Sequence, residues 1–365
     1  MTLTGTTLLV LLAVFAVAVI AATMALWNRW PGWTAFPLRL LSLLLVMLSG
    51  VLLAADLVNR EFGFYTSFND LLGRAPPPAS AAELLPTAPP ALPTGPQEHG
   101  QLVHDRLPGP RARVVRNALV YLPAAYFDPA QPNRHFPVVE LFHGRPGGPH
   151  NWARQLHLAH ALDTEIAAGR MQPVIVVATT DDNGAHDQEC VDAVRGVQDE
   201  TYLAVDVPAA LAGHFRVLDA PRAWAGLGYS TGGFCAVNLA LHHPERYAAA
   251  GSLSGYFRAV VDGDTGDLYR GRQDVRRWNS PQWLVTHQPV DTALYLAAGG
   301  DDHTAHRDML DLRRAIGTRA DVVAVTLPAG GHNFRVWSTA VPAAFDWLAG
   351  KLPAPPPGAG PTPAP

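Results

Sequence analysis

Two long apolar stretches lie at the start of the chain and differ from everything that follows. Leu8–Trp27 carries no charge, and Leu40–Ala55 is apolar or small throughout. The first is long enough to cross a bilayer as a helix, and the second reaches that length if Pro37–Arg39 joins it and Arg39 extends to the interface. The pattern predicts two transmembrane helices within residues 1–60. A cleaved signal peptide is the alternative for the first stretch.

Basic residues predict how these helices are oriented. The loop between them carries Arg29 and, at its end, Arg39, whereas no Lys or Arg precedes the first helix. Because short basic loops stay in the cytoplasm, both flanks are expected outside it. Arg60, beyond the second helix, opposes this only weakly, since Glu61 follows it. The sequence therefore predicts a multi-pass protein of the cell membrane, with the rest of the chain outside the cytoplasm.

Residues 61–98 are predicted to join the membrane helices to a globular domain. Glu61–Leu72 mixes aromatic and polar residues, as an interfacial helix does, and Ala75–Pro96 is rich in Pro and Ala. Such a composition is typical of a semi-rigid, extended linker. The Pro-rich tail, residues 353–365, is expected to be disordered and to carry no site. The globular domain is therefore assigned to residues 99–352.

Within this domain, short apolar runs alternate with helical patterns. A run that is apolar at every position, such as Val174–Ala178, is typical of a strand buried on both faces of a parallel sheet. The predicted strands are 101–105, 113–121, 138–142, 174–178, 223–227, 248–253, 293–298 and 322–327. The predicted helices are 157–168, 201–214, 233–242, 306–316 and 340–351, and the segment Phe257–Gln288 is interpreted as polar and irregular. The expected fold is α/β, with a mostly parallel sheet flanked by helices.

Composition and charge agree with one large domain. The chain has 365 residues, of which 48% are hydrophobic, enough for a sizeable core in a domain of about 250 residues. A net charge of −4 argues against nucleic acid as a partner. The two cysteines, Cys190 and Cys235, leave two readings open: a disulfide in an extracellular domain, or two buried small apolar side chains.

A Gly-x-Ser-x-Gly sequence, Gly228 to Gly232, follows the predicted strand Ala223–Leu227 and leads into the helical pattern Phe234–His242. A strand, a sharp turn and a helix expose the serine hydroxyl above an α/β sheet. Both glycines suit such a turn, which leaves almost no room for Cβ atoms beside the serine. Ser230 is therefore the candidate nucleophile. The alternative is a glycine-rich structural turn.

A candidate general base follows a later strand. Asp321–Leu327 runs into a loop that ends in Gly330-Gly-His332. Polar residues just past the carboxyl ends of strands build the sites of open α/β sheets. His332 is expected to take the proton from Ser230 and return it to the leaving group.

The acid that orients this histidine has several candidates. The predicted strand Ala293–Ala298 runs into Gly299-Gly-Asp301-Asp302. Asp302 is favoured by its spacing from Gly299, and Asp301 is the runner-up. The more distant carboxylates Asp187 and Glu189 also remain open.

An oxyanion hole and a metal site can also be considered. The strand Pro137–Phe142 leads into a Gly/Pro-rich loop that contains Arg145. The backbone N–H groups of Thr231 and Arg145 are the expected oxyanion donors, and a turn without a ligand is the alternative. Asp301, Asp302, His303 and His306 could be read as metal ligands, but the start of a helix explains the aspartates and no complementary cluster is evident. Neither a metal nor a cofactor is predicted.

With these motifs, the segments 200–208, 228–233, 243–247 and 251–255 resemble the esterase D and antigen 85 (mycolyltransferase) group of α/β-hydrolases. The resemblance extends over about residues 113–352. It implies the α/β-hydrolase fold, a Ser-His-acid triad on the three candidate residues, and hydrolysis of acyl esters or acyl transfer to an alcohol. Antigen 85 proteins typically have Glu as the acid, whereas the spacing here is closer to the Asp of the esterase D branch. The trehalose-binding signatures of antigen 85 are not evident.

The leading expectation is a serine hydrolase that cleaves acyl esters through an acyl-enzyme intermediate at the cell envelope, where lipids or acylated glycans are available substrates. An antigen 85-type acyltransferase is the first alternative. A non-catalytic surface binding module on a hydrolase scaffold is the second. The segment 257–288 lies where a hydrolase carries a cap or a substrate-facing insertion.

Overall fold

The computed structural model describes residues 6–29, 32–62, 87–180 and 187–354. The chain forms two compact units, Met1–Ala75 and Pro76–Pro365. The boundary between them lies within the predicted linker and outside the described residues. Most of the predicted interfacial helix and most of the predicted tail also lie outside the described residues. Residues 87–96 of the predicted linker contain neither helix nor strand.

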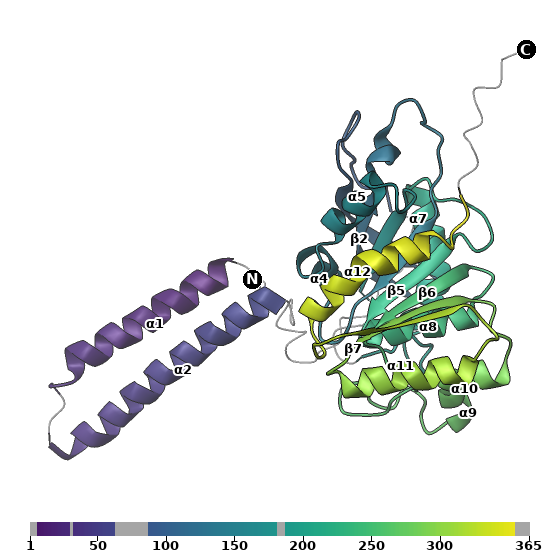
Figure 1. Ribbon diagram of the computed structural model, residues 1–365. Helices are drawn as coiled ribbons and strands as arrows, with labels where there is room; N and C mark the ends of the chain where they lie inside the picture. The colour runs from purple at the N-terminus through teal and green to yellow at the C-terminus, as the bar shows by residue number, and fades with distance from the viewer. Residues whose placement is uncertain (1–5, 30–31, 63–86, 181–186, 355–365) are drawn as a thin grey trace, which may run out of the picture. The chain divides into compact units, whose positions relative to one another are not determined.

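The N-terminal unit is a pair of helices that lie side by side, α1 (Thr6–Leu26) and α2 (Ala35–Phe62), joined through a short 3₁₀ turn at Gly32–Thr34 (Figure 1). The Arg39 side chain closes the connection, because its Nε donates to the Trp27 carbonyl at 3.1 Å and its guanidinium lies 5.1 Å from the indole centroid. Most large apolar side chains of both helices are exposed. By length and composition both helices could cross a membrane, so the prediction of two long apolar helices is confirmed.

The second unit is built on one eight-stranded sheet in the order β1-β2-β4-β3-β5-β6-β7-β8. The pairs β1–β2 and β2–β4 are antiparallel and all other pairs are parallel. The strands are β1 (Gln101–Gly109), β2 (Val114–Leu122), β3 (Val138–Phe142), β4 (Ile175–Thr179), β5 (Trp224–Tyr229), β6 (Tyr247–Leu253), β7 (Ala293–Gly299) and β8 (Val322–Leu327). The predicted fold class and all eight predicted strands are confirmed.

Helices cover both faces of the sheet, and each face has its own apolar core (Figure 1). Alternate residues of β3 divide between the cores, with Val138 and Phe142 in one and Val139 and Leu141 in the other. The first core is covered by α7 (Val207–His214), α8 (Thr231–His242), α10 (Pro281–His287) and α11 (His303–Ile316). The second is covered by α4 (Pro149–Arg154), α5 (Leu158–Ala167) and α12 (Phe334–Ala349).

Helix α4 was not predicted, and α11 begins at His303 instead of 306. Two other helical predictions differ more from the structure. The helix expected at 201–214 consists of α6 (Asp199–Thr201), a π-helical turn (Tyr202–Asp206) and α7. The last helix begins at Phe334 instead of 340, because the Asn333 side chain accepts from the Val336 N–H at 3.1 Å and caps it.

The interpretation of residues 257–288 as irregular was wrong in part. The segment contains α9 (Gln273–Trp278) and α10, which are separated only by Asn279 and Ser280. With 6 and 7 residues, both helices are shorter than two turns. They are therefore too short for apolar periodicity to appear in the sequence. Pro281 at the first position of α10 is well suited to that place, since its missing N–H would have no helical acceptor there.

Candidate active site

The turn between β5 and α8 holds Ser230 in a backbone conformation with positive φ, which residues other than glycine rarely adopt. Ser230 has φ 55° and ψ −126°, and its N–H donates to the Leu253 carbonyl at 2.9 Å. Glycine is required on both sides of it. A Cβ on Gly228 would lie 1.9 Å from the Gly232 carbonyl oxygen, and one on Gly232 would lie 2.2 Å from the Phe142 oxygen. The chain thus accepts strain at one residue, as functional sites often do, and presents the hydroxyl at the start of a helix.

Three side chains from separate loops form one hydrogen-bonded chain. His332 Nε2 lies 2.8 Å from Ser230 Oγ, and His332 Nδ1 lies 2.7 Å from Asp302 Oδ2. Asp302 is nearly buried, with 8% of its side chain exposed, whereas 46% of the His332 side chain is exposed. The acid end of the chain is therefore shielded from water, whereas the imidazole is partly exposed to solvent. All three candidates from the sequence are brought together by this arrangement.

The loop that carries His332 is fixed from both sides. Asp301, the alternative acid, accepts from the Gly330 N–H at 2.8 Å, whereas the imidazole is bonded to Asp302. Trp337 packs edge-on against the imidazole, with ring centroids 5.0 Å apart, and is itself stacked on Tyr229 at 4.7 Å. The first turn of α12 and the residue before the nucleophile therefore both limit how far the histidine can turn.

The two expected oxyanion donors come from adjacent segments. Thr231 is the first residue of α8, so its N–H has no acceptor within the helix and lies at the positive end of the helix dipole. The loop after β3 also lies close to the nucleophile, since a Cβ on Gly144 would lie 2.8 Å from Ser230 Cβ. Arg145 follows directly and precedes a cis peptide bond to Pro146.

The distant carboxylates occupy a different place from the one considered for them. Asp187 Oδ2 accepts from the Thr231 hydroxyl at 2.9 Å, and Glu189 accepts from the hydroxyls of Tyr256 and Tyr269 at 2.8 and 2.6 Å. Burial raises the pKa of Glu189 to about 8, although its hydrogen bonds act in the opposite direction. Neither carboxylate hydrogen-bonds to His332. The contact of Asp187 with Thr231 had no signal in the sequence.

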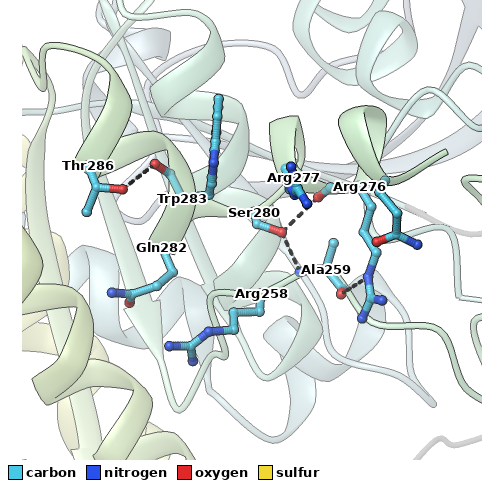
Figure 2. Close-up of a pocket in the computed structure, with 9 residues that line it drawn as sticks. Arg258, Ala259, Arg276, Arg277, Ser280, Gln282, Trp283 and Thr286 are labelled. Carbon is cyan, nitrogen blue, oxygen red and sulfur yellow. Dashed lines mark hydrogen bonds between the residues drawn. The ribbon is translucent and has the colours of Figure 1, made fainter.

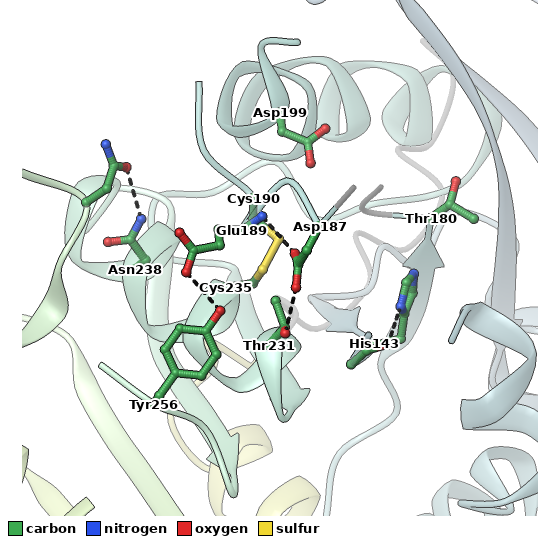
Figure 3. The surroundings of a disulfide bond; sticks show 12 residues. His143, Thr180, Asp187, Glu189, Cys190, Asp199, Thr231, Cys235, Asn238 and Tyr256 are labelled. Carbon is green, nitrogen blue, oxygen red and sulfur yellow. Dashed lines mark hydrogen bonds between the residues drawn. A yellow bond between two sulfur atoms is a disulfide. The ribbon is translucent and has the colours of Figure 1, made fainter. Parts of the chain in front are cut away.

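The two cysteines form a disulfide, which resolves the open alternative (Figure 3). Cys190 follows Glu189 in the loop, and Cys235 lies on the nucleophile helix α8. The bond thus attaches this loop to the helix that begins beside Ser230.

Three of the four residues considered as metal ligands, Asp301, Asp302 and His306, have other partners. Asp302 accepts from His332, and His306 Nε2 lies 2.9 Å from the Thr326 hydroxyl. Among the described residues, no group of three or more His, Cys, Asp or Glu side chains is placed to hold a metal ion.

A pocket of about 370 Å³ lies in the segment between β6 and β7, apart from this constellation (Figure 2). It is lined by side chains that include Arg258, Arg276, Arg277 and Trp283, and by none of the three triad candidates. Within it, Arg276 Nε donates to the Ala259 carbonyl at 2.9 Å. The pocket is therefore formed by α9, α10 and the segment around Arg258 that precedes them.

Comparison with known proteins agrees with the fold. The Esterase family model, described as "Putative esterase", matches residues 113–348. The chain is 29% identical over 253 residues to an uncharacterized protein of Corynebacterium glutamicum, which covers 64% of this chain and 57% of that protein. It is 34% identical over 107 residues to the MPT51 antigen of Mycobacterium leprae, which covers 27% of this chain and 35% of the antigen. The chain thus spans little more than half the length of the first relative and about a third of the second.

Among solved structures, a ferulic acid esterase superposes with a TM-score of 0.62 at 21% identity, over 71% of this chain and 100% of the other. At this identity the likeness shows the fold alone. The family model, however, covers more than half of the chain and includes Ser230, His332 and Asp302. These matches confirm the resemblance to the esterase D and antigen 85 group, and the chain belongs to the esterase family of α/β-hydrolases.

Proposed function

We propose that the chain is a serine esterase that cleaves carboxylic esters through an acyl-enzyme. The observation that carries this proposal is the position of His332, within hydrogen-bonding distance of Ser230 at one ring nitrogen and of Asp302 at the other. A serine hydroxyl is a weak nucleophile until an adjacent base takes its proton, and such a base must hold the correct tautomer.

In the proposed acylation, Ser230 Oγ attacks the ester carbonyl while its proton passes to His332 Nε2. The carbonyl electron pair moves to the oxygen, and the N–H groups of Thr231 and Arg145 are proposed to stabilise that oxyanion. When the intermediate collapses, the C–O bond to the alcohol breaks and the alcohol leaves with the proton from His332. Water then attacks the acyl-enzyme by the same steps, giving the acid and free Ser230.

Asp302 has a separate role in this scheme. Its buried carboxylate accepts the Nδ1–H of His332, which leaves Nε2 unprotonated and directed at Ser230. When the imidazole becomes charged, the same carboxylate stabilises the positive charge without taking the proton.

Acyl transfer remains the second candidate, because an alcohol that reaches the acyl-enzyme before water would accept the acyl group by the same chemistry. The similarity to the MPT51 antigen and the antigen 85 group favours keeping this candidate. An aligned Ser-His-Asp chain has no role in a non-catalytic binding module, so its presence argues against that alternative.

Labelling with a fluorophosphonate probe tests the common core of these proposals. Wild-type protein should be labelled at Ser230 and should hydrolyse short-chain aryl esters. Absence of both labelling and turnover in folded protein would favour the binding module. Product analysis with and without added sugar or lipid alcohols then separates hydrolysis from transfer, since only a transferase forms a new ester when the acceptor is present.

We further propose that α1 and α2 anchor the esterase in the cell membrane with the catalytic domain outside the cytoplasm. The two apolar helices and the basic residues Arg29 and Arg39 support this orientation. Envelope lipids or acylated glycans would then be the available ester substrates.

A further inference from the structure

The carboxylate of Asp187 is hydrogen-bonded to Thr231, the residue that follows the candidate nucleophile. Its Oδ2 accepts from the Thr231 hydroxyl at 2.9 Å, and its Oδ1 accepts from the Glu189 N–H at 2.9 Å. Asp187 and Thr231 are both nearly buried, with 7% and 8% exposed. Thr231 is also one of the two proposed oxyanion donors, through its backbone N–H. Asp187 therefore holds the hydroxyl of a residue whose backbone N–H is a proposed donor (Figure 3).

A second link joins the same two segments. Thr231 and Cys235 are four residues apart on α8, so they lie on one face of the helix. Asp187 and Cys190 are three residues apart in the loop opposite. The hydrogen bond and the disulfide thus attach one loop to one helical face, a turn apart.

The loop is held in a conformation that it would not keep by itself. Glu189 and Cys190 are consecutive non-glycine residues with φ of 47° and 51°. Such conformations cost free energy and persist only where the surroundings impose them. Here the disulfide holds one of the two residues, and the hydroxyls of Tyr256 and Tyr269 hold the buried carboxylate of the other.

We infer that Asp187 is a positioning residue for the oxyanion hole: its carboxylate fixes Thr231 through the hydroxyl, and the disulfide fixes the loop that presents the carboxylate. This inference rests on the proposed esterase function. Its physical basis is that an oxyanion donor stabilises the transition state only when it is already aimed at the oxygen. A helix end with a free first turn would have to be ordered in each turnover.

The charge of Asp187 makes the sign of the effect informative. A carboxylate near a developing oxyanion repels it, so its removal would speed the reaction if charge dominated. If positioning dominates, removal slows the reaction. The inference requires the second result.

A double-mutant cycle tests the contact. Thr231→Val keeps the backbone N–H and the branched shape but lacks the hydroxyl, and Asp187→Ala removes its acceptor. Each should lower kcat on the order of tenfold to a hundredfold with little change in KM, because misplacing a catalytic group acts on the transition state. The double variant should be no slower than the slower single variant, and Thr231→Ser should recover most of the wild-type kcat.

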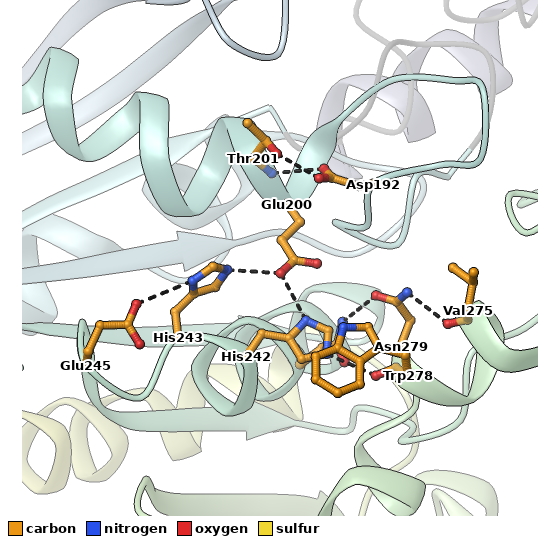
Figure 4. Close-up of polar contacts among 10 residues, drawn as sticks. Asp192, Glu200, Thr201, His242, His243, Glu245, Val275, Trp278 and Asn279 are labelled. Carbon is orange, nitrogen blue, oxygen red and sulfur yellow. Dashed lines mark hydrogen bonds and ion pairs between the residues drawn. The ribbon is translucent and has the colours of Figure 1, made fainter.

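A matched pair on the same stretch of chain serves as the control. Asp192 Oδ2 accepts from the Thr201 hydroxyl at 2.7 Å, the same chemistry at a place that does not contact Ser230 (Figure 4). Asp192→Ala and Thr201→Val should leave kcat unchanged in the folded protein.

Unchanged or increased kcat in Thr231→Val and Asp187→Ala, or losses that multiply in the double variant, would overturn the inference. Amide hydrogen exchange supplies a readout that needs no turnover. The first turn of α8, residues 231–234, should exchange faster in Asp187→Ala than in Asp192→Ala. Equal exchange in the two variants refutes positioning even if the wild type proves inactive, whereas the absence of Ser230 labelling in the wild type refutes the proposed function instead.

Discussion

His332 is the residue on which the proposed chemistry depends, because its ring nitrogens lie 2.8 Å from Ser230 and 2.7 Å from Asp302. Ser230→Ala should lower kcat for aryl esters on the order of 10⁶-fold, since the remaining groups cannot form an acyl-enzyme. Steady-state kinetics, with circular dichroism to check folding, measures this loss. Ser338→Ala, on α12, should behave as wild type. A folded Ser230→Ala protein with most of the wild-type turnover would show that another group is the nucleophile.

Asp302 and Asp301 are neighbours with different predicted consequences. Asp302→Asn should lower kcat on the order of 10⁴-fold, because an amide no longer selects the tautomer of His332 that can accept a proton at Nε2. Asp301→Asn keeps an oxygen that can accept from the Gly330 N–H, so its kcat should change little. Parallel measurements of kcat/KM on both variants decide between them. Equal, modest losses would point to a carboxylate elsewhere.

Glu200 predicts a pH dependence of stability away from the active site. Its carboxylate lies 3.0 Å from His242 Nδ1 and 2.9 Å from His243 Nε2 (Figure 4). Burial works against its charge, but these two bonds outweigh burial and lower its pKa to about 2. Burial likewise opposes the charge of His243, and the bond to Glu200 outweighs it and raises the pKa above the usual 6.5.

The two shifts act in different pH windows. The contribution of His243 is complete below pH 6.5 and is lost as pH rises through its raised folded pKa. The contribution of Glu200 is complete above pH 4.5 and is lost as pH falls toward about 2. Wild-type Tm should therefore exceed that of Glu200→Gln most between these limits, with the difference shrinking on either side. The measurement should run from about pH 3 to about pH 9, which includes the reference pKa values of Glu and His. A difference in Tm that is constant over this range would contradict the prediction.

At the scale of secondary-structure elements, the sequence predicted what depends on local pattern. The bounds of β3 and β8 match the prediction, since each is a short run of mainly apolar, β-branched residues that ends before a Gly-rich loop. The loops after β5, β7 and β8 carried the three triad candidates for the same reason. The short helices α9 and α10 gave no such pattern.

What the sequence could not predict is mainly contact between distant segments. The Asp187–Thr231 bond joins residues 44 apart, and nothing local to either residue marks it. The pairing of Cys190 with Cys235 was left open for the same reason. Asp187 was considered only as a possible triad acid, because a carboxylate in a sequence does not reveal which hydroxyl or imidazole it will face.

The disulfide between the loop and α8 makes a prediction at this scale. It joins residues 45 apart, so the chain-entropy account gives a stabilisation of about 4 kcal/mol. The double variant Cys190→Ala/Cys235→Ala should unfold at a clearly lower urea concentration than wild type. Adding a reductant should lower the wild-type midpoint and leave that of the variant unchanged. A midpoint that is the same in wild type and variant would mean that strain in the native loop offsets the entropic gain.

At the scale of the whole molecule, an esterase domain follows two apolar helices in one chain. Exposed apolar side chains along α1 and α2, such as Met24 and Phe36 at 76% and 77% exposure, are unfavourable in water and favourable in lipid. The proposed insertion into a membrane would account for this exposed apolar surface. The proposed orientation, with the esterase domain outside the cytoplasm, is based chiefly on Arg29 and Arg39.

Thiol labelling in intact cells tests this orientation, because both native cysteines are in the disulfide and give no background. Thr34→Cys lies between the helices, and Glu98→Cys lies just before β1. A membrane-impermeant maleimide should label Glu98→Cys in intact cells and Thr34→Cys only after lysis. The reverse pattern would place the esterase domain in the cytoplasm and would remove the case for envelope substrates. Loss of an N-terminal tag from mature protein would instead identify the first helix as a cleaved signal peptide, leaving α2 as a single anchor.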